Sequence, residues 1–432
     1  MRPHLRAGLG VWVVFATSVF AEDVVALKSA RLLDGRGEAP VRDAVVLIRG
    51  DRISAVGSRL PIPAGAKVID LGGATLLPGL IDCHDHLTSV PEDSGYNGLG
   101  VSLPRETLHG AASALKTLLA GFTSVRNVGA GGFSDVALRD AIEEGDLSGP
   151  RLLVSGPPLG ITGGHCDNNL LPYQFHYKEE GVADGPWEVR AKVREVVKYG
   201  ADLIKICASG GVLSKGDQPG TPQYTLEEIQ AIVAEAHKLG RKVAAHAHGA
   251  ESIKQAIQAG IDSIEHASLI DDEGLRLAKE KGTFLVMDIY NDDFILEQGA
   301  RVGMLPESIE KERKLGRLQR ENFRRAVQAG CRMAFGTDGG VYPHGNNARQ
   351  FHYMIEYGMT PMQAIRSATR DAAELLGWGD RVGTLEAGKY ADLIAVAADP
   401  LQDAHALEQV AFVMKGGRVV KQDGQPSPLS AR

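Results

Sequence analysis

Residues 79–87 read GLIDCHDHL, an apolar run that ends in two histidines, His84 and His86, one residue apart. On a β-strand, residues i and i+2 point to the same face, so these two imidazoles would project together. Such a pair can share a metal ion, but it also occurs as the polar end of an ordinary buried strand. The choice between the two depends on what the rest of the chain places beside it.

This stretch opens a long middle region, residues 76–378, in which short apolar runs alternate with helical patterns. One helix is expected from Thr225, with Glu228 completing a capping box and Gly240 marking the end; another is expected over residues 361–377. Eight strand-then-helix units predict an α/β fold, a (β/α)8 TIM barrel. A doubly wound open sheet is the alternative, but no GxGxxG turn follows the first strand. The eight strand candidates are residues 77–86, 123–129, 151–156, 202–211, 242–249, 262–267, 283–289 and 332–340.

The two ends of the chain differ from this middle. Residues 22–75 and 379–432 consist of short Val, Ile and Leu runs punctuated by Gly, Asp and Pro, which predicts a small β-sandwich domain built from both ends. An apolar content of 44% and a charged content of 23% fit a soluble globular protein. A formal net charge of -7 and the lack of a Lys/Arg stripe argue against a nucleic-acid partner. The mixed-charge segment 307–325 is expected to be the solvated face of a helix.

The N-terminus has the pattern of a secretory signal peptide. Arg2 and Arg6 precede an apolar run over residues 9–16, and small residues reach to Ala21, so cleavage is expected after Ala21. The alternative is an apolar N-terminal anchor. We expect an exported protein, periplasmic or secreted, with no membrane association after cleavage. The four cysteines, Cys83, Cys166, Cys207 and Cys331, show no paired spacing, and a disulfide among them stays open. Cys83 and Cys207 are expected to be small buried fillers and not ligands.

In a TIM barrel, functional side chains lie at the C-terminal ends of the strands. Five of the predicted strands end in, or contain near the end, a side chain that can bind a metal, and imidazoles with a carboxylate suit Zn²⁺. Lys205 is the most informative, because both faces of a parallel strand are covered and a buried lone ammonium tends to lose its proton. Lys205 pairing with an acid at the rim, and Asp338 as a turn residue, are the alternatives. The candidates are His84, His86, Lys205, His246, His248, His266 and Asp338.

These motifs resemble those of the amidohydrolase superfamily, and the resemblance covers nearly the whole mature chain. It rests on PGLIDCHDH, DLIKI, VAAHAHG, SIEHA, FGTDGG and the terminal GTLEAGKYADLIAV. Within the superfamily, ASGGVLS, QYTLEEI and HAHGAESIKQAIQAGIDSIEHAS are most similar to the imidazolonepropionase-related group that includes Xaa-Pro dipeptidases and ochratoxin-hydrolysing amidases. Conventional imidazolonepropionases and many deaminases lack the lysine of strand four, so Lys205 favours a binuclear hydrolase.

The resemblance implies two divalent ions, Zn²⁺ in our expectation. His84, His86 and Asp338 would hold the first ion, and His246 and His266 the second. Lys205, carboxylated on its amine (N6-carboxylysine), would bridge the two as a carbamate. His246 and His248 share a face of their strand, so the choice of His246 rests on the family motif, and His248 is the alternative ligand or an outer contact.

The resemblance also implies a reaction, the hydrolysis of an amide bond. A hydroxide formed between the two ions attacks the carbonyl, and Asp338 passes its proton to the leaving amine. His165 lies in a long loop over residues 156–186 and is expected to face the substrate carbonyl. Arg126 and Tyr224 are expected to hold the substrate carboxylate, or else to tether loops; Asn127 stands where relatives often have Asp.

The expected substrates are dipeptides of the Xaa-Pro or Xaa-apolar type, N-acyl amino acids, or ochratoxin-like amides. A lactonase or cyclic-imide hydrolase on the same site is an alternative, and so is a metal-free scaffold that has kept the fold. The only partners expected are a small-molecule or dipeptide substrate and, as a homo-oligomer, further copies of the chain.

Overall fold

The computed structural model describes residues 24–427. The predicted signal peptide, residues 1–21, lies outside the described residues. Within residues 24–427, no helix combines the length and the apolar character that a membrane crossing needs.

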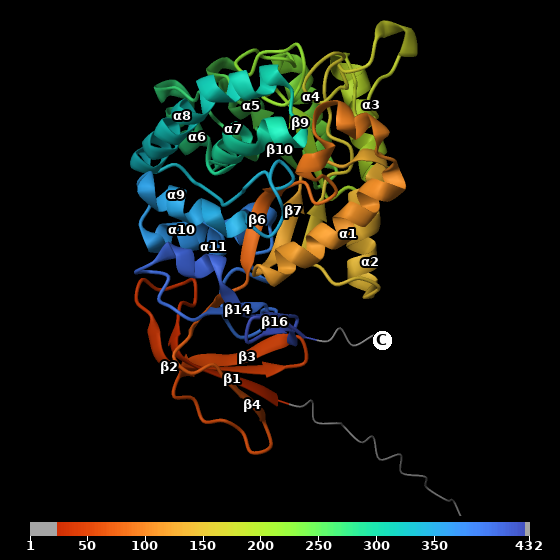
Figure 1. The fold of residues 1–432 in the computed structure, drawn as a ribbon. Helices are drawn as coiled ribbons and strands as arrows, with labels where there is room; N and C mark the ends of the chain where they lie inside the picture. Colours follow the sequence, from red (N-terminus) through yellow and green to blue (C-terminus); the bar gives the residue numbers. More distant parts are fainter. Residues whose placement is uncertain (1–23, 428–432) are drawn as a thin grey trace, which may run out of the picture.

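Strands from both ends of the chain lie together in one mixed sheet of nine strands, at the bottom of Figure 1. The order is β16-β15-β14-β13-β5-β1-β2-β3, with β4 paired to β1. Antiparallel pairing of β13 with β5 joins the C-terminal strands directly to the N-terminal ones, so both ends of the chain contribute to one hydrogen-bonded sheet, and its arrangement as a β-sandwich stays a prediction. The strands are β1 (Val24–Leu32), β2 (Val41–Arg49), β3 (Arg52–Ser58), β4 (Lys67–Asp70), β5 (Thr75–Pro78), β13 (Leu393–Val396), β14 (Val410–Lys415), β15 (Arg418–Gln422) and β16 (Gln425–Pro426).

The alternating middle region forms the larger body above this sheet, with helices surrounding the central strands (Figure 1). The strands are β6 (Leu80–Asp85), β7 (Phe122–Asn127), β8 (Arg151–Val154), β9 (Leu203–Cys207), β10 (Lys242–Ala247), β11 (Ser263–His266) and β12 (Phe284–Val286). The α-helices are α1 (Leu103–Leu119), α2 (Ser134–Glu144), α3 (Gly185–Lys198), α4 (Leu226–Lys238), α5 (Ala250–Ala259), α6 (Asp272–Lys281), α7 (Asn291–Val302), α8 (Pro306–Ala329), α9 (Gln350–Glu356), α10 (Pro361–Ser367) and α11 (Arg370–Leu376). Short 3₁₀ helices are η1 (Pro91–Asp93), η2 (Gly95–Gly100), η3 (Gly131–Phe133), η4 (Tyr173–Phe175), η5 (Asn347–Arg349) and η6 (Ala404–Glu408).

The central strands are parallel and form two sheets, β6-β7-β8 and β12-β11-β10-β9, and not one closed barrel. Isolated parallel bridges lie between the sheets. Leu159, which follows β8, pairs with Ile206 of β9, and Asp85 of β6 pairs with Gly339. Leu285 of β12 pairs with Met333 in the same way. The predicted strands at residues 77–289 are therefore all present, and their C-terminal ends share one side of the molecule.

The eighth predicted strand, residues 332–340, is the exception, since it makes bridges but no assigned strand. Its backbone bonds alternate between three partners: the amide of Ala334 donates to Leu285, that of Phe335 to Ser367, and that of Thr337 to His84. This irregular pairing keeps the segment beside both β12 and β6 without a continuous ladder.

Two helix predictions have different outcomes. The capping box is confirmed, because Thr225 accepts from the amide of Glu228 while the Glu228 carboxylate accepts from the amide of Thr225. The helix expected over 361–377 is instead two helices, α10 and α11, with Thr369 in a non-helical conformation between them. The break leaves the carbonyls of Ser367 and Ala368 to accept hydrogen bonds from Phe335 and Ile81 of the central strands.

The charged segment 307–325 is helical, as expected, but it is not simply a solvated face. Glu312, Gln319 and Phe323 of α8 are buried.

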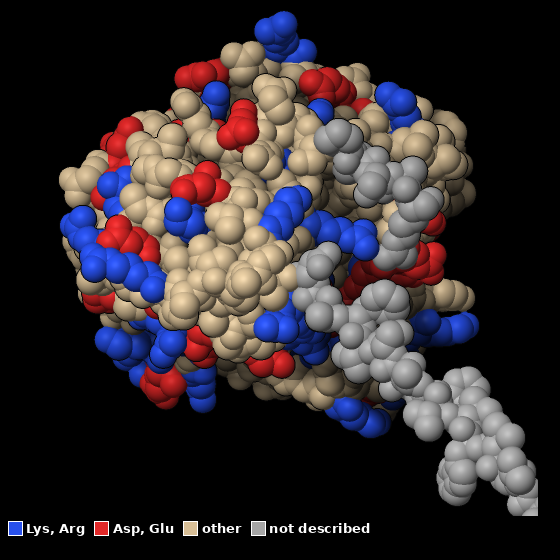
Figure 2. All heavy atoms as spheres, turned by 90° about the horizontal axis from the view of Figure 1, so that it is seen from below, with Lys and Arg blue, Asp and Glu red and all other residues tan. Residues whose placement is uncertain are grey.

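On the face of the molecule that Figure 2 shows, Lys and Arg side chains are interspersed with Asp and Glu, so that face carries no continuous basic stripe.

Candidate metal centre and active site

The six expected metal ligands all line one cavity of about 570 Å³, at the C-terminal ends of the central strands. This volume is typical of a small-molecule site. His165 also lines the cavity. The six ligands are His84, His86, Lys205, His246, His266 and Asp338.

The first group of expected ligands comes from the end of β6 and from the segment after Phe335. One carboxylate oxygen of Asp338, Oδ1, lies 3.4 Å from Nε2 of His84 and 3.3 Å from Nε2 of His86. Asp338 has a positive φ of 57°, a conformation that costs energy in a non-glycine residue and here turns its side chain toward the pair. The three residues form a group that can hold a metal ion.

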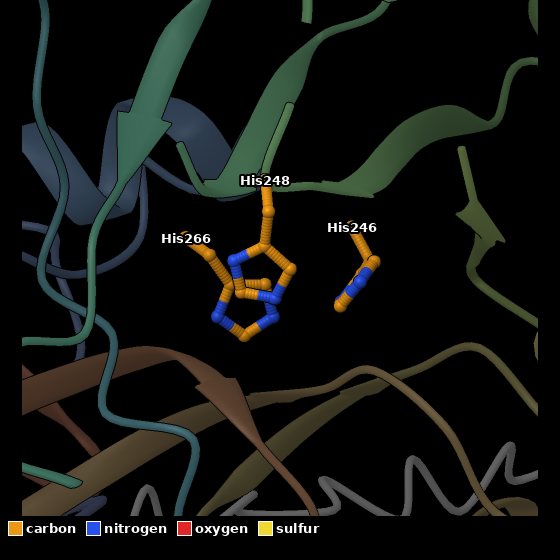
Figure 3. A group of neighbouring side chains, drawn as sticks. All are labelled: His246, His248 and His266. Atoms are coloured by element: carbon orange, nitrogen blue, oxygen red, sulfur yellow. The ribbon is translucent and has the colours of Figure 1, made fainter. Parts of the chain in front are cut away.

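The second group consists of three buried imidazoles from β10 and β11 (Figure 3). The rings of His248 and His266 are stacked at 4.7 Å, and that of His246 meets both edge-on. Nδ1 of His248 is bonded to the Ser268 hydroxyl at 2.7 Å, which leaves Nε2 as its metal-binding nitrogen. Nε2 of His246 lies 3.1 Å from the carbonyl of Gly210, which leaves Nδ1. The structure thus brings His248 into the same group as His246, and both stay candidates.

Lys205 lies in β9 between these groups and is 3% exposed. Burial lowers the pKa of its ammonium to about 8, although the nearby carboxylates of Glu265 and Asp338 oppose this shift. A larger fraction of Lys205 is therefore a neutral amine near pH 8 than for a lysine in water. A neutral amine is the form that reacts with carbon dioxide.

Three of the imidazoles in the site are neutral, which is the form that binds a cation, and His84 is the exception. Burial holds the pKa values of His246, His248 and His266 well below the ordinary value, so these imidazoles are neutral. His84 differs: burial and Lys205 act against its charge, but Asp338 and Glu265 raise its pKa to about 9. A proton on His84 therefore occupies the place that a metal ion would take. Neutral imidazoles with an ionised carboxylate are a donor set that fits Zn²⁺.

Two buried carboxylates that were not predicted from the sequence lie beside these histidines, and one of them, Asp288, also lines the cavity and forms a possible metal-binding group with His84 and His266. Glu265 lies 3.3 Å from Nδ1 of His84, and Asp288 lies 2.7 Å from Nδ1 of His266. The hydrogen bond of Asp288 fixes the ring of His266, and Glu265 lies close enough to act on His84 through its charge. The signal for Asp288 was present in the sequence, because it lies near the end of the seventh predicted strand, residues 283–289, just as the expected ligands lie near the ends of theirs.

We expect Glu265→Gln to weaken metal binding about 10- to 100-fold, because the amide no longer supports Nδ1 of His84 as a carboxylate does. Competition with a calibrated chelator measures the change. Glu251→Gln is the matched control, since Glu251 is 60% exposed and outside the site. Equal metal affinity in both variants would show that Glu265 does not support the ligand.

His165 is held in the cavity by residues of the loop after β9. Its Nδ1 lies 2.8 Å from the Ser214 hydroxyl, which donates to Asp217 at 2.7 Å. Its ring stacks on His246 with centroids 4.1 Å apart. Burial lowers the pKa of His165 to about 4, so the ring is neutral and can donate a hydrogen bond from one nitrogen.

A disulfide joins Cys166 to Cys207, so the residue after His165 is tied to the end of β9, two residues from Lys205. The expectation that Cys207 is only a small buried filler is therefore wrong, and the possibility of a disulfide, which the sequence left open, is realised. Nothing local in the sequence signals the pair, because the partners are 41 residues apart. Cys83 and Cys331 are free.

We expect the double variant Cys166→Ser/Cys207→Ser to lose about 2–4 kcal/mol of unfolding free energy, because the link closes a long loop in the unfolded chain. Urea unfolding of the oxidised protein and the variant measures the difference. Cys331→Ser is the control, and a double variant as stable as this control would contradict the prediction.

Arg126 and Tyr224 do not face the cavity, which corrects the expectation that they bind substrate. The Arg126 guanidinium lies below the metal ligands and donates to the carbonyl of Cys83, the Ser263 hydroxyl and the Glu265 carboxylate. Tyr224 is 1% exposed, and its hydroxyl donates to the carbonyl of Ala183. Asn127, also buried, bonds to Asp135. These side chains bond to other protein groups, and they support the site without lining the cavity.

The fold and the site define the class of the protein: the chain belongs to the amidohydrolase family, whose profile matches residues 75–420. It is a hydrolytic enzyme acting on amide C–N bonds.

Within this family, the chain is similar to several characterised proteins. The ochratoxinase of Aspergillus niger is 35% identical over 93% of this chain and 87% of its own length. Its solved structure superposes with a TM-score of 0.85 over 95% of this chain and 99% of that one. A Xaa-Pro dipeptidase with bound methionine in its active site is 38% identical, with a TM-score of 0.86 over 92% of this chain and 100% of that one. A prolidase complexed with N-methylphosphonate-L-proline is 33% identical, with a TM-score of 0.85 over 92% of this chain and 100% of that one.

Proposed function

We propose that the protein hydrolyses the amide bond of dipeptides with a C-terminal proline or apolar residue, or of related N-acyl amino acids, including ochratoxin-like amides. The observation that carries the proposal is the convergence of six metal-binding side chains on one cavity in a chain similar to a Xaa-Pro dipeptidase and an ochratoxinase. The first substrate class follows the dipeptidase and prolidase, and the second follows the ochratoxinase.

Two divalent ions, Zn²⁺ in our proposal, would be held by His84, His86 and Asp338 on one side and by His246 and His266 on the other. When bound, such ions polarise a carbonyl and lower the pKa of water. Lys205 would join the two halves after its amine adds carbon dioxide, which converts a costly buried cation into an anion between cations.

The side chains around the ions would carry the proton and charge movements. Asp338 lies between the two histidines of β6, where its carboxylate takes a proton from the attacking water and returns it to the leaving nitrogen. His165 would donate a hydrogen bond from Nε2 to the carbonyl oxygen as negative charge develops there, in the tautomer whose Nδ1 accepts the hydroxyl hydrogen of Ser214 in place of Asp217. Ser214 and the disulfide hold His165 against His246 for this role.

The walls of the cavity agree with an apolar substrate side chain. Val212, Ile295 and Val341 line it and belong to one apolar cluster between α7, α8 and the loops. The loop after β8 supplies a further wall through Asn168 and Leu170. An apolar pocket beside a few fixed polar groups is the usual arrangement for binding an organic ligand.

The remaining predictions belong to this proposal as well. The two parallel sheets and the bridges between them support a barrel of eight units, with a small β domain built from residues 22–75 and 379–432. Because β5 extends to Pro78, the first of these segments is better ended at residue 78.

The disulfide supports an oxidising, extracytoplasmic location after removal of a signal peptide. A homo-oligomer stays a proposal.

The test is a substrate screen with the Zn²⁺-loaded protein. Dipeptides of the Xaa-Pro, Xaa-Phe and Xaa-Arg types, N-acyl amino acids, lactones and cyclic imides are compared by kcat/KM. We expect Xaa-Pro or Xaa-apolar amides to exceed lactones and imides by at least about tenfold, since a tenfold preference needs only about 1.4 kcal/mol. Faster turnover of lactones or imides would contradict the proposal.

A further inference from the structure

One end of the cavity is acidic and carries oxygen atoms that no described residue satisfies. Asn291 at the start of α7 and Glu312 of α8 both line the cavity, with 6% and 3% exposure. Among the residues that the structure describes, Oδ1 of Asn291 and Oε1 of Glu312 have no hydrogen-bond partner. Buried acceptors without a donor are costly, so a donor is missing from this end of the cavity.

The carboxylates at this end of the cavity also have few cations beside them. Glu312 faces Asp292, and a Cβ at Gly316 would lie 2.6 Å from Oε1 of Glu312 and 2.9 Å from Oδ2 of Asp292, so the glycine leaves room for both. Arg320 is the cation that meets this pair, through Asp292 at 3.2 Å, and it also pairs with Asp293 at 2.8 Å. Burial and the charge of Asp292 raise the pKa of Glu312 well above its ordinary value. Without a further cation at this end, Glu312 therefore tends to keep a proton beside Asp292, and a positive group placed next to it would favour its ionised form.

This acidic end lies beside the proposed chemistry. Nδ2 of Asn291 donates to Asp288 and lies 3.4 Å from Oδ2 of Asp338. In a dipeptide, the α-amino group is two bonds from the carbonyl carbon that is attacked. A substrate carbonyl near Asp338 therefore carries its α-amino group close to Asn291. Ile295, one helical turn further along α7, lines the same cavity beside the substrate side chain.

We propose that Asn291 and Glu312 form a subsite for the protonated α-amino group of the substrate's N-terminal residue. The inference rests on the proposed amidohydrolase function and refines it: the preferred substrates have a free amino group, so they are dipeptides and not N-acyl amino acids. The ammonium supplies both the missing donor and the missing positive charge. Asp292 and Arg320 position Glu312 and do not contact the substrate.

The test compares one substrate pair in wild type and Glu312→Gln. The pair is the best dipeptide of the screen, for example leucyl-proline, and the same molecule with the α-amino group replaced by hydrogen, 4-methylpentanoyl-proline. We expect wild type to prefer the dipeptide by about 10- to 100-fold in kcat/KM, the range for a hydrogen bond to a charged group. Glu312→Gln should lose about this factor on the dipeptide and stay within about twofold on the des-amino compound.

The des-amino compound also controls for folding, because a general loss of structure would lower both rates. Glu310→Gln is the matched variant on the same helix, since Glu310 is 48% exposed and pairs with Arg313 and Lys314 at the surface. Equal losses on the two substrates, or no preference in wild type, would overturn the subsite.

A binding measurement separates this inference from the proposed function. Calorimetry with leucine and with 4-methylpentanoate tests the subsite even if wild type hydrolyses neither substrate, which would contradict the proposed function alone. We expect wild type to bind leucine at least about tenfold more tightly, and Glu312→Gln to remove most of that difference. Equal binding of the two ligands by wild type would contradict the subsite.

Discussion

Lys205→Ala is expected to lower kcat/KM by about 1,000-fold or more, because the two metal ions lose the group that joins them and several kcal/mol of charge stabilisation go with it. The variant should also bind fewer than two ions per chain. Steady-state kinetics on the best amide of the screen and metal analysis of the dialysed protein measure the two effects. If Lys205 were an ordinary buried ammonium and not a carbamate, its removal would instead relieve a desolvation cost and leave the metal content unchanged.

Two controls separate a lost ligand from a damaged strand. Lys238→Ala removes a lysine that is 70% exposed and should leave kcat/KM unchanged. A small carboxylic acid such as acetate, added to Lys205→Ala, should restore part of the activity by placing a carboxylate in the space that the side chain leaves. Wild-type activity in Lys205→Ala would contradict the carbamate assignment.

Asp338→Asn is the second large effect, with an expected fall in kcat of about 10²- to 10⁴-fold, the range of a general acid–base group. The amide keeps the shape of the carboxylate and an oxygen that can face a metal ion, but it cannot take the proton of the attacking water. KM should change much less than kcat, since the substrate binds to other groups. Stopped assays with the metal-loaded variant measure both constants.

The matched control for this variant is Asp272→Asn, because Asp272 has a side chain that is 96% exposed. Metal analysis shows whether Asp338→Asn keeps its ions, which distinguishes a lost proton acceptor from a lost ligand. A kcat within tenfold of wild type in a variant that keeps both ions would exclude Asp338 as the proton carrier.

The central strands, and the gathering of the expected ligand side chains at their ends, were predictable from the sequence. The i, i+2 spacing of His84 and His86 places both on one side of β6, and the structure brings them within 3.4 Å and 3.3 Å of Asp338. This worked because parallel strands bring their C-terminal ends to one side whatever the length of the loops between them. The absence of a continuous ladder at residues 332–340 was not predictable, since this segment shares its bonds between β12, β6 and Ser367.

Contacts between distant segments were also beyond a reading of the sequence. Arg126 looks like a rim cation in the sequence, but three acceptors from β6 and β11 bind it below the site. The disulfide of Cys166 and Cys207 depends on how the loop after β8 folds back on β9. Glu312 belongs to a helix whose charges suggested a solvated surface, and only the packing of α8 against α7 buries it.

The most direct test of the central claim is the metal content of the purified wild-type protein, measured by elemental analysis and paired with an amidase assay before and after Zn²⁺ is added. The account predicts two divalent ions per chain, loss of activity on chelation, and recovery on Zn²⁺ addition. A protein that binds no ion and stays inactive with Zn²⁺ would contradict it.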